Sequence, residues 1–161
     1  MLVTCIVESV RVHVQSGGHV VLLQERDAKR MVPIWIGADQ AHSIATRLAG
    51  IASERPLTHD LLRHIIARLG ARVSRIVVKD IVTDETGGGV FHGSVFLEAG
   101  GEEMEIDARP SDAIALALRC GAPILVAEAV FERSGITNAS EDDGDLSVFR
   151  SFIETLPDPS P

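Results

Sequence analysis

The residue types best suited to chemistry lie in the segment IDARPSD, at the predicted junction between a strand and a helix. Asp107 ends the strand, and Arg109 and Pro110 form the bend. Ser111 and Asp112 then open the helix. Pro110 suits the first turn of a helix, where the missing N–H is not needed. Free backbone N–H groups and the positive end of the helix dipole favour an anion at this point, and Arg109 can hold a phosphate through two hydrogen bonds.

Two carboxylates flank this bend. Asp107 and Asp112 lie five residues apart, and carboxylate oxygens are the ligands that hard divalent cations prefer. A cation held by both would bridge to a phosphate bound by Arg109 and Ser111. The alternative is purely structural: Ser111 or Asp112 caps the helix, and Arg109 pairs with Asp107. The residues alone leave both interpretations open.

A second Arg-Pro pair, Arg55-Pro56, precedes another predicted helix start. His59 in its first turn can act as a general base or a metal ligand. Asp60 can orient that imidazole or bind metal itself. The alternative is a polar first turn with no catalytic role. No histidine pair has zinc-ligand spacing with a third ligand, which argues against a zinc site.

Composition restricts the class of protein. The 161 residues are 45% hydrophobic and suit one domain. No apolar run is long enough for a membrane helix, and two cysteines are too few for a disulfide framework, so we expect a cytoplasmic protein. The formal net charge is −8, which disfavours non-specific binding to nucleic acid. Residues 135–161 carry six acids against one base, so much of this charge lies in the tail.

The periodicity predicts an α+β fold with a mixed, mainly antiparallel sheet and packed helices. Strands are expected at 3–14, 20–24, 31–36, 73–82, 90–98, 103–107 and 123–127, and helices at 41–48, 58–69 and 111–119. A shift of 70 residues aligns the two halves as a repeated β-β-β-α unit, although coincidence among apolar strands is the alternative. Trp35 is expected in the core. Leu62, Ile65, Ile66 and Leu69 are expected as the buried stripe of the second helix.

Three regions follow from this pattern: a folded domain over 1–134, an acidic linker over 135–144 and an amphipathic helix over 145–156. The third helix of the domain, with alanine alternating with larger apolar residues, is apolar all round. Such a helix must be covered, so we expect a homodimer or a higher homo-oligomer.

Three ordered blocks resemble the bifunctional nuclease domain family: MVPIWIGADQAHSIATRLAG, RPLTHDLLRHIIARLG and IDARPSDAIALALRCGAPILVAEAV. The resemblance implies a nuclease that cleaves RNA and DNA with help from Mg²⁺ or Mn²⁺. The resemblance matches these charged and polar positions, and on them we expect catalysis by His59, Asp60, Asp107 and Asp112. Phosphate binding is expected at Arg55, Arg109 and Ser111, and metal binding at Asp107 and Asp112. One departure is Gln40, where relatives usually carry glutamate; a family metal ligand at that position would be lost here.

Two other functions stay open. The acidic balance, the few aromatic residues and Gln40 all suit a non-catalytic oligomeric module that binds an anionic ligand or a protein partner. An enzyme acting on a small phosphorylated substrate is the third interpretation. A continuous positive groove around the junction would favour the nuclease, and a closed pocket of nucleotide size would favour the third.

Overall fold

The structure is a computed structural model that describes residues 1–13, 15–86 and 88–137. The predicted helix over 145–156 and most of the predicted linker lie outside these residues. A single sheet runs through the domain in the order β6-β5-β4-β7-β1-β2-β3-β8. Its strands are β1 (Leu2–Val12), β2 (His19–Glu25), β3 (Arg30–Ile36), β4 (Arg72–Thr83), β5 (Gly89–Ala99), β6 (Glu102–Ala108), β7 (Ile124–Ala127) and β8 (Ile136–Thr137).

Two three-stranded antiparallel meanders make up most of this sheet. The strands β1, β2 and β3 form one, and β4, β5 and β6 form the other. The short strand β7 joins them, antiparallel to β1 and parallel to β4. The predicted α+β class with a mixed, mainly antiparallel sheet is therefore confirmed. Each meander is followed by a helix, but an origin by duplication stays a prediction.

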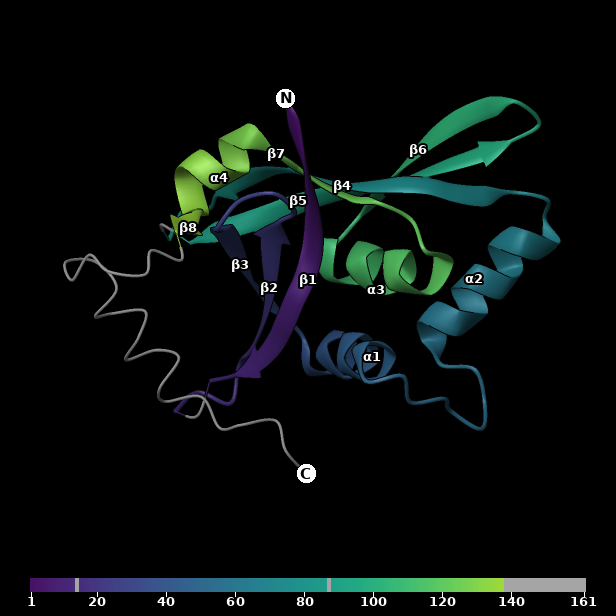
Figure 1. The fold of residues 1–161 in the computed structure, drawn as a ribbon, viewed down its shortest axis with the longest axis horizontal. Helices are drawn as coiled ribbons and strands as arrows, with labels where there is room; N and C mark the ends of the chain where they lie inside the picture. Colours follow the sequence, from purple (N-terminus) through teal and green to yellow (C-terminus); the bar gives the residue numbers. More distant parts are fainter. Residues whose placement is uncertain (14, 87, 138–161) are drawn as a thin grey trace.

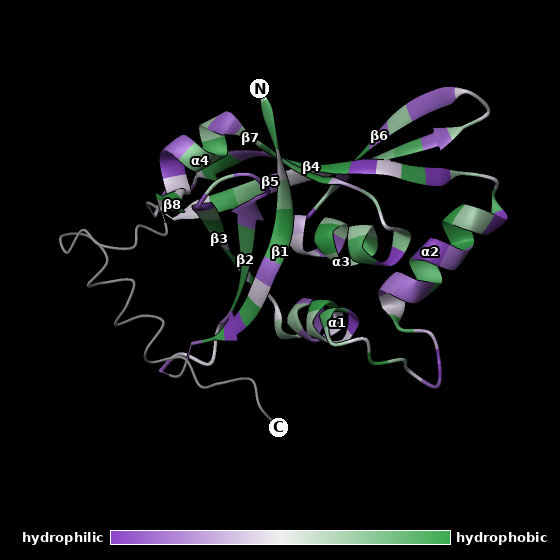
Figure 2. Cartoon of the chain, viewed as in Figure 1, coloured by the Kyte–Doolittle hydropathy of each residue, from purple (hydrophilic) through white to green (hydrophobic). Residues whose placement is uncertain are grey.

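Four helices accompany the sheet: α1 (Ala38–Leu48), α2 (Thr58–Arg68), α3 (Pro110–Cys120) and α4 (Glu128–Ser134). The sheet is strongly bent, and α1 and α3 lie in the angle between its two halves (Figure 1). Helix α3 packs against α1, α2, β4 and β5, whereas α4 packs on β3, β4 and β7. The strands and α3 carry most of the hydrophobic residues around this angle (Figure 2), and they form one continuous core.

The apolar helix α3 is covered within its own chain. Its residues from Ala113 to Ala117 are all buried, and Ile114 is fully enclosed. The other helices and the bent sheet bury the apolar surface of α3, as its sequence pattern requires. An oligomer is therefore not needed to explain this helix, and the homodimer stays a prediction without that support.

Four predicted core positions prove to be wrong. Trp35, near the end of β3, is 56% exposed. Helix α2 leaves Leu62, Ile65 and Leu69 exposed and half-buries only Ile66. The apolar spacing of α2 is regular, but this helix lies at the margin of the domain (Figure 1). Its side-chain hydrogen bonds to α3 come from His59 and Asp60 in its first turn.

Two short elements were not expected from the sequence. Helix α4 follows β7 directly, and β8 pairs with the start of β3 through Thr137 and Arg30. Neither has enough residues to show a clear period. Ile136 and Thr137 fall in the segment predicted as linker. No helix in the described part of the chain is both long and apolar enough to cross a membrane.

The junction between β6 and α3 lies directly against β5 because of a glycine. Gly93 is paired with Ala108 across the two strands. A Cβ atom at Gly93 would lie 3.1 Å from the Ala108 carbonyl oxygen and 3.4 Å from the Pro110 Cα atom. Close backbone approach of this kind is a common reason for glycine inside a strand. It sets the start of α3, with Pro110 as its first residue, beside α2.

Candidate active site at the meeting of three helices

His59, in the first turn of α2, is held between two other helices. It is 5% exposed. Its Nε2 atom lies 3.0 Å from Asp112 Oδ1 on α3, and its Nδ1 atom lies 2.7 Å from Ser43 Oγ on α1. Both ring nitrogens are therefore used, as is usual for a buried imidazole.

Asp112 continues this chain of contacts to the surface. Arg109 donates to Asp112 Oδ2 from Nε and from a terminal nitrogen, both at 2.8 Å. The Arg109 side chain is 69% exposed, against 30% for Asp112. Burial alone would raise the pKa of Asp112, but the hydrogen bonds from His59 and Arg109 lower it below its ordinary value. The carboxylate is therefore ionised at neutral pH.

This ionised carboxylate determines the direction of the hydrogen bonds. Asp112 can only accept, so Nε2 of His59 carries a proton and donates it. In a neutral imidazole the other nitrogen, Nδ1, is then an acceptor. The Ser43 hydroxyl consequently donates to His59. The order hydroxyl, imidazole, carboxylate is that of a nucleophile or relay, a base and an orienting group.

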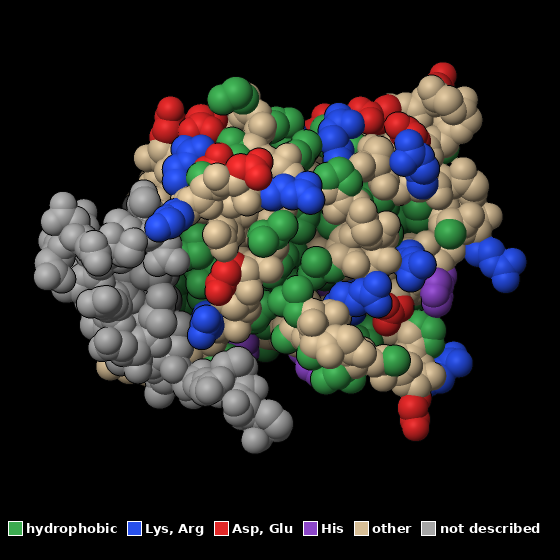
Figure 3. Space-filling view, in the orientation of Figure 1, with side chains coloured by type: hydrophobic (Ala, Val, Ile, Leu, Met, Phe, Trp, Pro, Cys, Tyr) green, Lys and Arg blue, Asp and Glu red, His purple; other side chains and the backbone are tan. Residues whose placement is uncertain are grey.

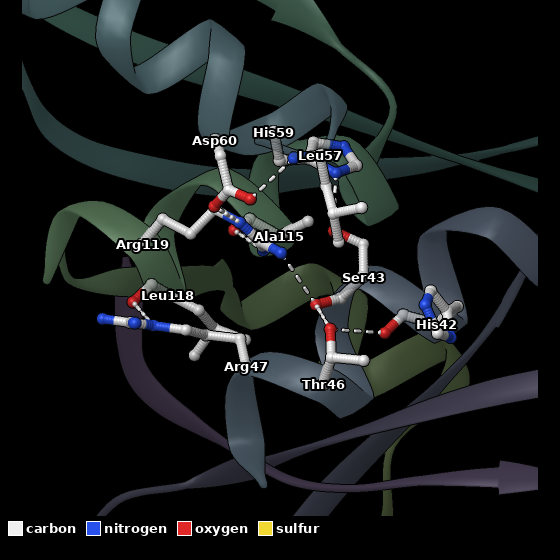
Figure 4. A network of polar contacts seen from close by, with 10 residues as sticks. All are labelled: His42, Ser43, Thr46, Arg47, Leu57, His59, Asp60, Ala115, Leu118 and Arg119. Atoms are coloured by element: carbon white, nitrogen blue, oxygen red, sulfur yellow. Dashed lines mark hydrogen bonds and ion pairs between the residues drawn. The ribbon is translucent and has the colours of Figure 1, made fainter. Parts of the chain in front are cut away.

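A second carboxylate, Asp60, faces a different partner. It accepts the Leu57 N–H at 2.9 Å and the Arg119 Nε–H at 2.7 Å. Arg119 has a side chain that is 4% exposed and donates to the carbonyl oxygens of Ala115 and Ser43, at 3.0 and 3.1 Å. Its guanidinium lies between the three helices (Figure 4). Burial opposes ionisation of Asp60, but the Leu57 and Arg119 hydrogen bonds lower its pKa.

An open cavity of about 520 Å³ lies over the His59–Asp112 pair. Its lining residues are Asp39, Gln40, His42, Ser43, Leu57, Thr58, His59, Leu62, Arg109 and Asp112. One arginine thus faces two acids, Asp39 and Asp112. Positive and negative side chains are also interspersed on the face shown in Figure 3. The lining of this cavity is therefore not a positive groove, and phosphate attraction there depends on Arg109.

The structure brings together part of the predicted site. His59, Arg109 and Asp112 meet, so the first turn of α2 and the start of α3 converge on one cavity. Asp60 lies next to His59 in the chain but turns to Arg119. No side chain caps α3, and Arg109 pairs with Asp112, so the simple structural alternative is wrong in both parts.

Three predicted site residues are placed elsewhere. Arg55 is exposed in the loop before α2, and Asp107 is exposed on β6 opposite Ser94. Ser111 is buried in the first turn of α3. None of the three is among the residues that line the cavity over His59. Their assigned roles stay predictions.

The donor atoms at this site do not match a metal centre. Within the described ranges, no three His, Cys, Asp or Glu side chains are grouped so as to hold a metal ion. Both oxygens of Asp112 already bind His59 and Arg109. Gln40 brings a neutral amide to the same cavity where a glutamate would bring a carboxylate. The predicted Mg²⁺ or Mn²⁺ stays a prediction.

Sequence reasoning missed Ser43 and Arg119. Ser43 is 16 residues from His59 in a different helix, and a serine inside an apolar helical stripe gives little signal by itself. Arg119 is the more detectable of the two. It is a lone charge at the end of the apolar helix α3, and such a residue is seldom buried without a partner.

Comparisons with known proteins identify the family of this chain. The family model described as the bifunctional nuclease domain matches residues 21–139. An uncharacterized protein of Mycobacterium tuberculosis strain H37Rv is 34% identical over 159 residues, covering 93% of this chain and 92% of the relative. Bifunctional nuclease 1 of Oryza sativa subsp. indica is 26% identical over 120 residues, covering 73% of this chain and 35% of the rice protein. The chain therefore belongs to the bifunctional nuclease domain family.

Proposed function

We propose that this protein hydrolyses phosphodiester bonds of RNA and DNA at the cavity over His59. The observation that carries the proposal is the continuous chain Ser43–His59–Asp112–Arg109, which joins a buried base to an exposed phosphate-binding group. The rice relative is named a bifunctional nuclease, and the family model matches the elements that supply these residues. Both support a nuclease-related function.

Arg109 binds the substrate phosphate in this proposal. Its side chain is mostly exposed, and its contact with Asp112 is a surface ion pair that contributes little stability. An incoming phosphate can therefore share or replace Asp112 as its partner. A planar guanidinium also suits the two equatorial oxygens of the phosphoryl group as charge develops there.

His59 accepts the proton released during attack on phosphorus. Nε2 is held by Asp112, so the accepting atom is Nδ1. The group on Nδ1 is the Ser43 hydroxyl, which passes its proton to His59 while it takes one from the attacking water. The new P–O bond forms as the bond to the leaving oxygen breaks. The imidazolium then gives its Nδ1 proton back to the Ser43 hydroxyl, which passes a proton to the leaving oxygen. Asp112 stabilises the imidazolium in between.

The test compares His59→Gln with His64→Gln, an exposed histidine on the same helix. Cleavage of single-stranded RNA and DNA should fall about 10²- to 10⁴-fold in His59→Gln, the contribution typical of a general base. It should be unchanged in His64→Gln. Ser43→Ala should behave like His59→Gln, with circular dichroism confirming that each variant is folded. Full activity in both His59→Gln and Ser43→Ala would assign the cleavage to another site or to a contaminating nuclease.

A non-catalytic module that binds an anionic ligand is the second candidate. It is favoured by the donor atoms of the cavity, where Gln40 brings a neutral amide and the described residues form no metal-binding cluster. In that case the purified protein binds a short oligonucleotide or a nucleotide through Arg109 and releases it unchanged. Chromatography of the bound ligand after incubation separates this outcome from hydrolysis.

A further inference from the structure

Arg109 also lines a second cavity, of about 360 Å³. It is formed by the end of β3, the start of β5 and the start of α3, and its apolar lining includes Trp35, Val90 and Phe91. Trp35 is the only tryptophan of the chain and is 56% exposed. Large exposed aromatic side chains in a cavity are typical of ligand contacts rather than of packing.

The Trp35 indole is supported from the hairpin between β1 and β2. The His13 ring meets it edge-on, with ring centroids 6.0 Å apart and an interplanar angle of 72°. At Gly18 a Cβ atom would lie 2.7 Å from the indole Cζ3 atom, so only glycine leaves room for the ring there. The indole is thus fitted into this position although more than half of Trp35 is exposed.

Arg109 connects this cavity with the one over His59, because it lines both. A ligand with a phosphate on Arg109 would therefore have its next group within reach of Trp35. In a single-stranded nucleic acid, that next group is a nucleobase whose flat face is free to stack.

We propose that Trp35 forms a base-stacking subsite for single-stranded nucleic acid, adjacent to the phosphate held by Arg109. The inference rests on the proposed function and specifies its substrate class. A duplex does not fit, because its bases already stack on their neighbours.

The charges around Arg109 limit the electrostatic contribution to affinity at this subsite. The cavity over His59 carries more acid than base, so few phosphates can be neutralised. A single neutralised phosphate predicts a weak salt dependence for a single strand, with a slope of log K against log[salt] of about −0.7. Base stacking adds affinity that salt does not screen.

The experiment uses the full chain and its own fluorescence, since there is no tyrosine and only one tryptophan. The probe is a short oligothymidylate with non-hydrolysable phosphorothioate linkages, and the control is an abasic oligomer of the same length. We expect saturable quenching of Trp35 by the oligothymidylate and none by the abasic oligomer. A duplex of the same sequence should quench weakly.

A binding assay with a fluorophore-labelled oligothymidylate extends the test to the variants. Trp35→Ala should weaken binding at least about fivefold, the lower range for loss of one stacked base. Trp35→Phe should restore much of it, because a phenyl ring still stacks. Val82→Ala is the matched control, since Val82 is similarly exposed and does not line this cavity; it should bind as the wild type does.

The outcomes separate this subsite from the proposed activity. Quenching by the oligothymidylate in a protein that cleaves nothing supports the subsite and rejects the nuclease. Cleavage that depends on His59, with no quenching and unchanged binding by Trp35→Ala, rejects the subsite alone. Equal quenching by the abasic oligomer would also overturn the stacking proposal.

Discussion

Two arginine–aspartate pairs lie on either side of His59, and they differ in their surroundings. Arg119 and Asp60 meet where three helices pack together, and Arg119 is 4% exposed. Arg109 and Asp112 meet at the rim of a cavity, with Arg109 69% exposed. The same two side-chain types thus form a buried ion pair in one place and an accessible ion pair in the other. Burial, rather than residue type, distinguishes the two roles.

Loss of the buried arginine should have the largest effect on stability. Arg119→Ala leaves the Asp60 carboxylate without its partner and removes the hydrogen bonds to Ala115 and Ser43. We expect the free energy of unfolding to fall by about 3 kcal/mol, the lower end for a broken buried pair, because Asp60 keeps some contact with water. Urea titration followed by circular dichroism measures this. A change below about 1 kcal/mol would mean that the buried pair stabilises the fold no more than the exposed pair does.

Loss of the exposed arginine should change stability little and weaken binding strongly. Arg109→Ala breaks a surface pair and should change the unfolding free energy by less than about 1 kcal/mol. It should weaken binding of the oligothymidylate about tenfold or more, as expected for a charge-assisted hydrogen bond to phosphate. Arg109→Lys keeps the charge and is the matched control, with an intermediate loss. If Arg109→Ala destabilised the fold as much as Arg119→Ala does, the main role of Arg109 would be structural.

The pH dependence of stability compares the two aspartates, Asp60 and Asp112. Both aspartates have pKa values lowered in the folded state, so each stabilises the fold above the unfolded pKa, near 3.9. That contribution is lost as the pH falls through the folded value. Asp60→Asn should therefore flatten the decline of stability below about pH 4, and Asp112→Asn should do so as well. Urea unfolding from pH 2.5 to 7 tests both variants, and an unchanged slope in both would contradict the lowered pKa values.

The local features of the site were largely predictable. The Arg-Pro pair before α3 predicted a helix start at the bend, and Pro110 is its first residue. The pairing of Arg109 was predicted with the wrong acid. Asp107 and Asp112 lie at similar distances from Arg109 in the chain, and only the turn of α3 brings Asp112 beneath the guanidinium while β6 carries Asp107 outward to solvent.

Exposure was the least predictable property. Trp35 and Leu62 both occupy apolar positions with regular spacing, and both are exposed in the structure. Periodicity tells which residues share a face of a strand or helix. Whether another element covers that face depends on the bend of the sheet and on where α2 lies at its margin.

The sequence by itself determined the order of the longer strands and helices, the charge of the tail, the helix start at Pro110 and the family. These properties depend on residues close to one another in the chain. The tertiary structure decided that Ser43, His59 and Asp112, separated by 16 and 53 residues, form one chain of hydrogen bonds. It also decided that Asp60 binds Arg119. The physical reason is that the packing of α1, α2 and α3 in the bend of the sheet sets which polar groups are buried together, and buried polar groups must find partners.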